Sequence, residues 1–148
     1  MARFKYQMQN ILRIKEKMED QAKLEFAMAQ TTYYKEENKL FALMKRNDAY
    51  LKEGIRLREK QLYVRDIKEN KAAILQMDLY IQEQEKVLKK AEEALEKAKE
   101  QLMFVRRERK THEILKESAF EVYKKEEQTK ESMEIDELVS YVYGKKGE

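Results

Sequence analysis

The chain has 148 residues, of which 41% are charged and 42% apolar, with three glycines and no proline. Sheets, barrels and α/β folds need frequent Gly, Pro, Asn or Asp at turns, so this composition excludes them and favours long helices. The net charge of +3 requires no anionic partner, and the absence of cysteine excludes disulfides and thiol nucleophiles. No apolar stretch approaches the roughly 18 residues of a membrane span, so we expect a cytoplasmic protein.

The first half of the chain predicts a helix over residues 3–52. Its apolar residues alternate at three- and four-residue spacing, which is typical of a coiled-coil seam, the two rows of side chains that face a partner helix. Glu36 and Asn47 interrupt the rows, and a second consecutive four-residue step, from Ala22 to Phe26, predicts a stutter. The predicted seam residues are Phe4, Met8, Ile11, Met18, Ala22, Phe26, Ala29, Tyr33, Leu40, Leu43 and Tyr50.

Gly54 predicts the bend between two antiparallel helices. Glycine costs about 1 kcal/mol in a helix interior and caps helix C-termini, and the seam is also poorest near Asn47, Gly54 and Gln61. We therefore predict a turn over about 53–61. With the bend at this place, Phe4 would pack near Glu108.

A second helix is predicted over 62–141, with a flexible tail at 142–148. Two rows of residues repeat every seven positions and form the clearest seam in the chain. Beyond Val105 the three-residue step from His112 to Leu115 predicts a stammer where helix 1 runs out. The predicted fold is all-α, a single domain formed by an antiparallel two-helix coiled-coil hairpin with a longer C-terminal helix. The rows are Ile67, Ile74, Ile81, Leu88, Leu95 and Leu102, and Met77, Gln84, Ala91, Ala98, Val105 and His112, followed by Arg109, Leu115, Ala119 and Val122.

No group of residues predicts catalysis, a cofactor or a metal site. The scattered glycines cannot form a phosphate loop, and paired carboxylates such as Glu92 and Glu93 are typical of solvated helix faces. The single histidine, His112, is either a ligand or proton switch or, as we favour, a polar layer in the seam. Acidic residues interleave with the basic run 106–110, so nucleic acid is not an expected partner.

Apolar residues beside the seam predict docking to other proteins. One row on each helix, expected to converge near the turn, either docks a partner or widens the interface between the two helices. Beyond the hairpin, Ile135, Leu138, Val139 and Val142 form an amphipathic patch that has no partner helix left in the chain. The flanking rows are Tyr34, Phe41, Met44 and Leu51 on helix 1, and Ala73, Tyr80, Val87 and Ala94 on helix 2.

Three segments together resemble one protein family. They are the aromatic and aliphatic start at residues 4–16, the glycine turn followed by Ile74, Met77 and Ile81, and the C-terminal box at 130–138, which ends in Ile135-Asp136-Glu137-Leu138. In these segments, and over essentially its whole length, the chain resembles the FliJ family of the bacterial flagellar export apparatus.

The resemblance implies a non-enzymatic coiled-coil stalk without a cofactor, similar to the central stalk of rotary ATP synthases. It implies binding to the hexameric export ATPase, the membrane export gate and export chaperones during flagellum assembly, and peripheral association with the inner membrane at the flagellar base. By analogy with the rotary stalk, the hairpin end would meet the gate and the end with the termini would enter the ATPase ring. The expected gate residues are Met44, Tyr50, Leu51, Ala73, Met77 and Tyr80, and the expected ring residues are Phe4, Met8, Ile11, Leu115, Ile135, Asp136, Glu137 and Leu138.

Three other interpretations remain open from the sequence. The chain could be the equivalent stalk of a virulence-type secretion system. It could also be a coiled-coil arm that binds RNA, or a homodimeric tether built on one continuous helix. An ATPase captured from cell extract, salt-sensitive RNA binding and sedimentation would distinguish these classes.

Overall fold

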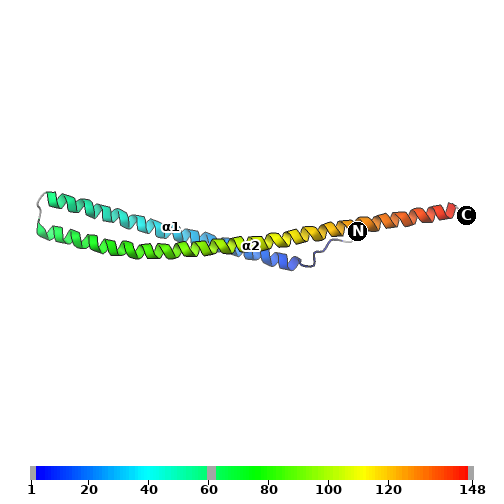
Figure 1. The fold of residues 1–148 in the computed structure, drawn as a ribbon, viewed down its shortest axis with the longest axis horizontal. Helices are drawn as coiled ribbons and strands as arrows, with labels where there is room; N and C mark the ends of the chain where they lie inside the picture. The colour runs from blue at the N-terminus through cyan, green and yellow to red at the C-terminus, as the bar shows by residue number, and fades with distance from the viewer. Residues whose placement is uncertain (1–2, 60–62, 147–148) are drawn as a thin grey trace. The chain divides into compact units, whose positions relative to one another are not determined.

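Two long helices make up most of the protein. In the computed structural model, which describes residues 3–59 and 63–146, α1 is Gln9–Glu59 with 51 residues and α2 is Val64–Lys146 with 83 residues (Figure 1). The described residues contain no strand. The predicted all-α class, with a C-terminal helix longer than the first, is therefore confirmed.

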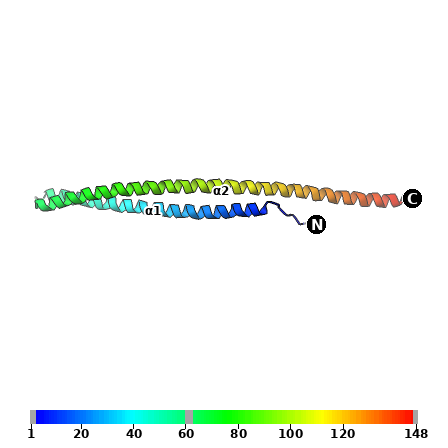
Figure 2. The same cartoon turned by 90° about the horizontal axis from the view of Figure 1, so that it is seen from below.

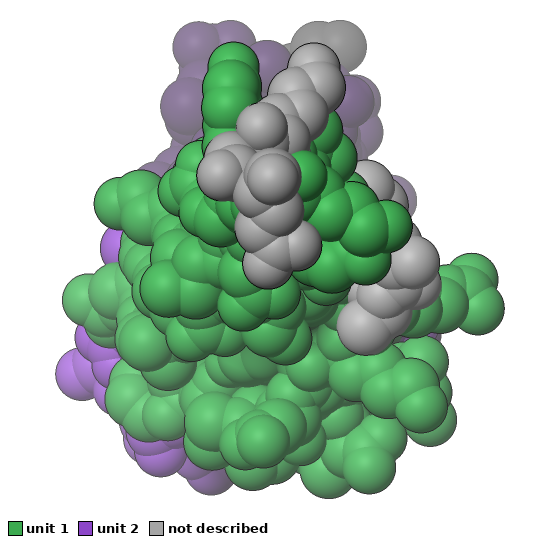
Figure 3. All heavy atoms as spheres, turned by 90° about the vertical axis from the view of Figure 1, so that its right-hand side faces the viewer, with its two compact units in different colours: residues 1–20, 104–148 green, residues 21–103 purple. Residues whose placement is uncertain are grey.

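The chain divides into two compact units, and each contains a part of both helices. Unit 1 consists of residues 1–20 and 104–148, and unit 2 of residues 21–103 (Figure 3). Within unit 2, the two helix segments lie side by side in both ribbon views (Figures 1 and 2). They are antiparallel, because Tyr50 contacts Asn70 while the earlier Glu36 contacts the later Gln84.

The predicted seam of unit 2 is confirmed. Both rows on α2 from Ile67 to Leu102 are shielded from solvent, and Met77 and Ala91 are buried. The matching positions of α1 are shielded as well, including the polar Glu36 and Asn47. Burial of this apolar stripe stabilises the pair, at roughly 25 cal/mol for each Å² removed from water.

The predicted bend at Gly54 is wrong, because Gly54 is a buried residue inside α1. A Cβ atom at this position would lie 2.5 Å from the Asn70 side-chain oxygen. The Asn70 amide is held there by donating a hydrogen bond of 2.9 Å to the Tyr50 carbonyl oxygen. Glycine at this position thus permits a close approach of α2 and does not end the helix. Leu57, which was not predicted, is also buried.

The helix boundaries differ from the prediction accordingly. Residues 53–59 of the predicted turn are helical, and residues 60 and 61 lie outside the described residues, as does 62. Helix α1 begins at Gln9, not at residue 3, and residues 142–146 of the predicted tail belong to α2. The later reversal shifts the pairing, so that Phe4 contacts Phe120 and Tyr123 rather than the region of Glu108.

The stutter and the stammer are also absent from the described residues. In unit 1 the shielded positions of α1 are Gln9, Leu12, Lys15 and Glu19, and the last three keep the regular spacing that leads to Ala22. The apolar Met8, Ile11 and Met18 are more exposed, at 42%, 37% and 39%. On α2 the regular spacing continues through charged and aromatic residues, while Leu115 and Val122 are 48% and 55% exposed. The shielded α2 positions of unit 1 at this spacing are Val105, Arg109, His112, Lys116, Ala119 and Tyr123, while Glu108, Glu113 and Glu127 are shielded outside this row.

Candidate functional site

A group of charged side chains replaces apolar contacts in the middle of unit 1. The Glu19 side chain is 7% exposed and accepts a hydrogen bond from Nε of Arg109. Arg106 Nε lies 3.5 Å from the other Glu19 carboxylate oxygen, and Arg109 Nη1 lies 2.7 Å from Glu113. The hydrogen bonds that Arg109 donates to Glu113 and Glu19 raise the pKa of Arg109 above its ordinary value. Both charge signs are present, so the four side chains Glu19, Arg106, Arg109 and Glu113 pair with one another and have a structural role.

Two further contacts join the paired segments of unit 1 on the side of Glu19 that leads to the N-terminus. Lys15 Nζ donates a hydrogen bond of 2.8 Å to Glu108 across the two helices. Toward the N-terminus, the Phe4 ring lies edge-on to Phe120 at 5.1 Å and tilted to Tyr123 at 5.3 Å. This aromatic cluster fixes the segment that precedes α1 against α2.

His112 keeps the seam position predicted for it and is half-buried. Its Nδ1 atom is buried and has no hydrogen-bond partner among the described residues. Among residues 3–59 and 63–146, no three His, Cys, Asp or Glu side chains come close enough together to hold a metal ion. The polar-layer interpretation of His112 thus stays a prediction that its position favours.

Unit 2 contains isolated polar layers between its apolar ones. Gln84 Nε2 donates to the Glu36 carbonyl oxygen at 3.0 Å and to its carboxylate at 2.6 Å. This hydrogen bond, more than the nearby Lys39, lowers the pKa of the Glu36 carboxyl group. Asn47 donates a longer bond of 3.5 Å to Asp78. Such layers cost stability but fix the pairing register.

The six expected gate residues do not form one surface. Met77 is 5% exposed and Tyr50 is half-buried, so both belong to the seam. Met44, Leu51 and Tyr80 are exposed, at 43%, 45% and 48%. Buried residues cannot provide a docking surface, so only the exposed members stay candidates for partner contact.

The two flanking rows also lie on opposite sides of the seam, which corrects their expected convergence. Ala73 lines a hollow together with Glu53 and Arg56 of α1. Leu51 is two residues from Glu53, which corresponds to about 200° around an α-helix. Leu51 therefore points away from the flank that carries Ala73. Met44 lies in the same row as Leu51, because the two are seven residues apart. Tyr80 lies in the same row as Ala73 for the same reason.

The expected ring residues fall into two groups within unit 1. Phe4 is half-buried in the aromatic cluster, while Met8, Ile11 and Leu115 are partly exposed beside the seam. The C-terminal members are fully on the surface: Ile135 is 59% and Leu138 is 64% exposed, and Asp136 and Glu137 are exposed too. Every residue over 128–145 is exposed, so this stretch of α2 offers an unpartnered apolar stripe.

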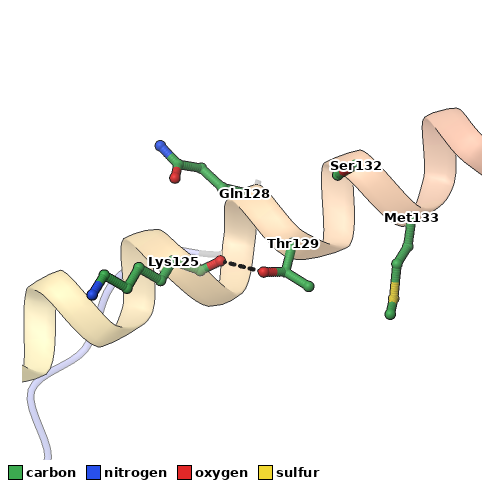
Figure 4. Close-up of a pocket in the computed structure, with 5 residues that line it drawn as sticks. All are labelled: Lys125, Gln128, Thr129, Ser132 and Met133. Carbon is green, nitrogen blue, oxygen red and sulfur yellow. Dashed lines mark hydrogen bonds between the residues drawn. The ribbon is translucent and has the colours of Figure 1, made fainter.

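A surface hollow that overlaps this stretch belongs to a single helix. It is lined by Lys125, Gln128, Thr129, Ser132 and Met133, all from α2 (Figure 4). The Thr129 hydroxyl donates to the Lys125 carbonyl oxygen at 2.8 Å, so it serves the helix backbone (Figure 4). The side chains point outward around the helix and do not converge on a common point, which catalysis would require.

Within the described residues, neither α1 nor α2 has an apolar stretch long enough to cross a membrane. Sequence reasoning missed the Glu19 and Arg109 contact and the aromatic partners of Phe4. In the sequence, these contacts are indicated only by charged or aromatic residues at seam spacing. A search for rows of apolar residues does not detect them.

Comparison with known proteins agrees with the resemblance noted from the sequence. The model of the flagellar FliJ protein family matches residues 4–148. Among solved structures, a YscO homologue from Chlamydia trachomatis, CT670, has 22% identity and a TM-score of 0.62, over 95% of this chain and 96% of that one. This second likeness concerns the fold. No curated protein matches the sequence. The family match covers nearly the whole chain, and the protein therefore belongs to the FliJ family of flagellar export components.

Proposed function

We propose that this chain is a non-enzymatic stalk that couples a hexameric export ATPase to a membrane export gate and assists export chaperones during flagellum assembly. The observation that carries the proposal is the family match over residues 4–148. The unpartnered apolar stripe over residues 128–145 supports it, because exposed apolar surface of this extent is typical of protein interfaces. The stalk would be cytoplasmic and reach the inner membrane through its partners.

The ATPase contact is proposed for the C-terminal stripe. Ile135 and Leu138 are 59% and 64% exposed on α2, so their substitution removes little buried surface from the chain itself. Replacing both with serine, as Ile135→Ser and Leu138→Ser, should abolish co-purification of the export ATPase while leaving the helical circular dichroism signal unchanged. Burying two such side chains contributes about 3–6 kcal/mol to an interface.

A matched control keeps this experiment specific. Leu75 and Leu79 are equally exposed on α2, at 66% and 56%, but belong to unit 2. The double variant Leu75→Ser and Leu79→Ser should retain the ATPase. Undiminished capture by the C-terminal variant, or equal loss in both variants, would contradict the assignment of the stripe.

The gate contact is proposed for one of the two flanks of unit 2. Serine substitutions at Met44 and Leu51 test one flank, and serine substitutions at Tyr80 and Val87 test the other. Because the rows lie on opposite sides, only one pair should weaken binding of the gate protein in a pull-down. Loss in both pairs with reduced helicity would assign the residues to the helix interface instead.

The equivalent stalk of a type III secretion system is the second candidate function. The shared fold with the YscO homologue from Chlamydia trachomatis favours it. A pull-down from cell extract with the full chain separates the two candidates. A flagellar export ATPase among the captured proteins supports the first, and a secretion-system ATPase supports the second.

A further inference from the structure

A hollow of about 370 Å³ lies in unit 1 where α1 begins. It is lined by the segment that precedes α1, by the first turns of α1, and by Lys116 of α2. Three of its lining residues, Lys5, Arg13 and Lys116, are cationic, and none is acidic. The volume falls at the lower end of the range for ligand sites, about 300–1,000 Å³. The other lining residues are Phe4, Tyr6, Gln9 and Asn10.

These three cations differ from their charged neighbours in lacking partners. Lys15, Arg106 and Arg109 of the same unit each form an ion pair with a glutamate. No ion pair or side-chain hydrogen bond to the described residues is formed by Lys5, Arg13 or Lys116. In a chain with 29 acidic residues, a concave site that gathers only unpaired cations has the charge of an anion site.

The helix terminus adds to this positive potential. Helix α1 has no acidic residue in its first turn, so its N-terminal dipole is not neutralised from within the helix. Gln9 and Asn10 of that turn line the hollow. The Gln9 N–H donates to the Tyr6 carbonyl oxygen at 3.1 Å. N–H groups at a helix start that have no such partner are suited to anions, and nearby lysine or arginine side chains strengthen the attraction.

One polar group beside the hollow is unsatisfied. Tyr6 also lines the hollow, and its hydroxyl is buried without any hydrogen-bond partner among the described residues. Leaving such a group unsatisfied costs about 1–3 kcal/mol, and buried hydroxyls therefore normally have partners.

From these observations we propose that the hollow binds an acidic segment of a partner protein, through carboxylates held by Lys5, Arg13 and Lys116. Three cations from separate parts of the chain suit several carboxylates better than a single small ion. The rings of Phe4 and Tyr6 add apolar surface suited to the aliphatic stems of glutamate side chains. The proposal goes beyond the stalk function, since it assigns a ligand class to a site that the family match does not define.

The test uses the full chain and a fluorescein-labelled hexaglutamate peptide, with affinity measured by fluorescence anisotropy at low salt. The double variant Arg13→Gln and Lys116→Gln should weaken binding about tenfold or more, as expected for lost charge complementarity at a concave site. Binding to the wild-type chain should fall as salt rises. A hexalysine peptide should not bind.

The matched control is Lys86→Gln with Lys97→Gln, which removes the same charge from exposed positions of unit 2. It should bind the peptide as the wild-type chain does. Equal weakening in both double variants would overturn the proposal, because the attraction would then come from net charge alone. Binding of inorganic phosphate without binding of the peptide would also overturn it.

Lys5→Gln keeps the test decisive if the double variant loses helical signal. Lys5 precedes α1, so its substitution leaves both helices intact. Severalfold weaker peptide binding in this variant supports the site, and unchanged binding overturns it. Both readouts use only the purified chain and a synthetic peptide, so their outcome does not depend on whether the ATPase or the gate binds.

Discussion

Units 1 and 2 pair segments of the same two helices, but they do so with different chemistry. In unit 2 the shielded positions are mostly apolar, with single polar layers at Glu36, Asn47, Asn70 and Gln84. In unit 1 the same heptad positions carry Lys15, Glu19 and other charged residues. The difference teaches that the same heptad spacing can carry apolar burial in one unit and ion pairing in the other.

The comparison predicts that unit 1 depends on its charge pairs. Glu19→Ala leaves Arg106 and Arg109 next to each other without the carboxylate between them, and like charges then repel. We expect the largest effect here, a fall of several degrees in melting temperature, and faster hydrogen exchange in unit 1. The measurement is thermal unfolding followed by circular dichroism, with exchange monitored by mass spectrometry.

The control for this prediction is Glu16→Ala, which removes the same charge from an exposed position of α1. Its melting temperature should stay within about a degree of the wild-type value, since exposed charges contribute little. If the two variants had the same melting temperature, the ion pairs of Glu19 would contribute no more to stability than an exposed charge does.

Unit 2 should respond most strongly to steric changes at its close helix contact. Gly54→Ala places a Cβ atom 2.5 Å from the Asn70 side-chain oxygen, which is itself held in place by the amide bond to Tyr50. Asn70 must move, and we expect a loss of about 1–3 kcal/mol in the free energy of unfolding, measured by denaturant titration.

Gly144→Ala provides the opposite case within the same chain. Gly144 is helical, and a Cβ atom there would meet nothing within 4 Å. Alanine has the higher helix propensity, so this change should raise stability by up to about 1 kcal/mol. Stabilisation by both substitutions would mean that helix propensity, and not the approach of Asn70, governs the Gly54 position.

Much of unit 2 could be predicted from the sequence, while much of unit 1 could not. The strict seven-residue rows from Ile67 to Leu102 identify their own buried face, because apolar side chains at that spacing must leave water. Glu19 and Arg109 give no such signal, since 41% of the residues are charged and their pairing depends on segments far apart in sequence. Gly54 misled because glycine fits both a helix end and a close contact, and only the position of Asn70 decides between them.

The candidate functional surfaces divide in the same way. The exposed stripe that contains Ile135 and Leu138 could be predicted, because its apolar residues continue after the partner helix has ended. The basic hollow could not, since Lys116 joins Lys5 and Arg13 only through the tertiary pairing. The expected single gate surface is not formed, because two apolar rows can flank one seam on opposite sides.

The aromatic cluster should matter less than the charge pairs, and only locally. Phe120→Ala removes the ring that contacts Phe4, which we expect to cost about 1–2 kcal/mol. Because Phe4 precedes α1, the loss should appear as faster proteolysis within residues 3–8. Phe104→Ala is the control: Phe104 is 49% exposed in the same unit, and its substitution should leave the cleavage rate unchanged. Equal cleavage in both variants would show that the cluster does not hold this segment.

The smallest effect concerns the polar layer at Glu36 in unit 2. The Gln84 amide lowers the pKa of the Glu36 carboxyl group from its ordinary value of 4.5. A lowered folded-state pKa means that the contribution to stability is fully present above the ordinary value and is lost as pH falls through the lowered one. Stability in this region should therefore decline as the solution is acidified below about pH 5.

Gln84→Leu removes the amide donor and keeps an apolar side chain in the seam. The pKa of Glu36 should then rise toward its ordinary value, and the acid-dependent part of the unfolding free energy should shrink, because the bond that distinguished the folded carboxylate is gone. Carboxyl chemical shifts of Glu36 across pH 3–6 measure the pKa directly, and Gln76→Leu, at an exposed position of α2, serves as the control. If the pKa of Glu36 is unchanged in Gln84→Leu, then Lys39 and the other nearby lysines lower it, and the seam hydrogen bond does not. The polar layer at Glu36 would then make no acid-sensitive contribution to the stability of unit 2.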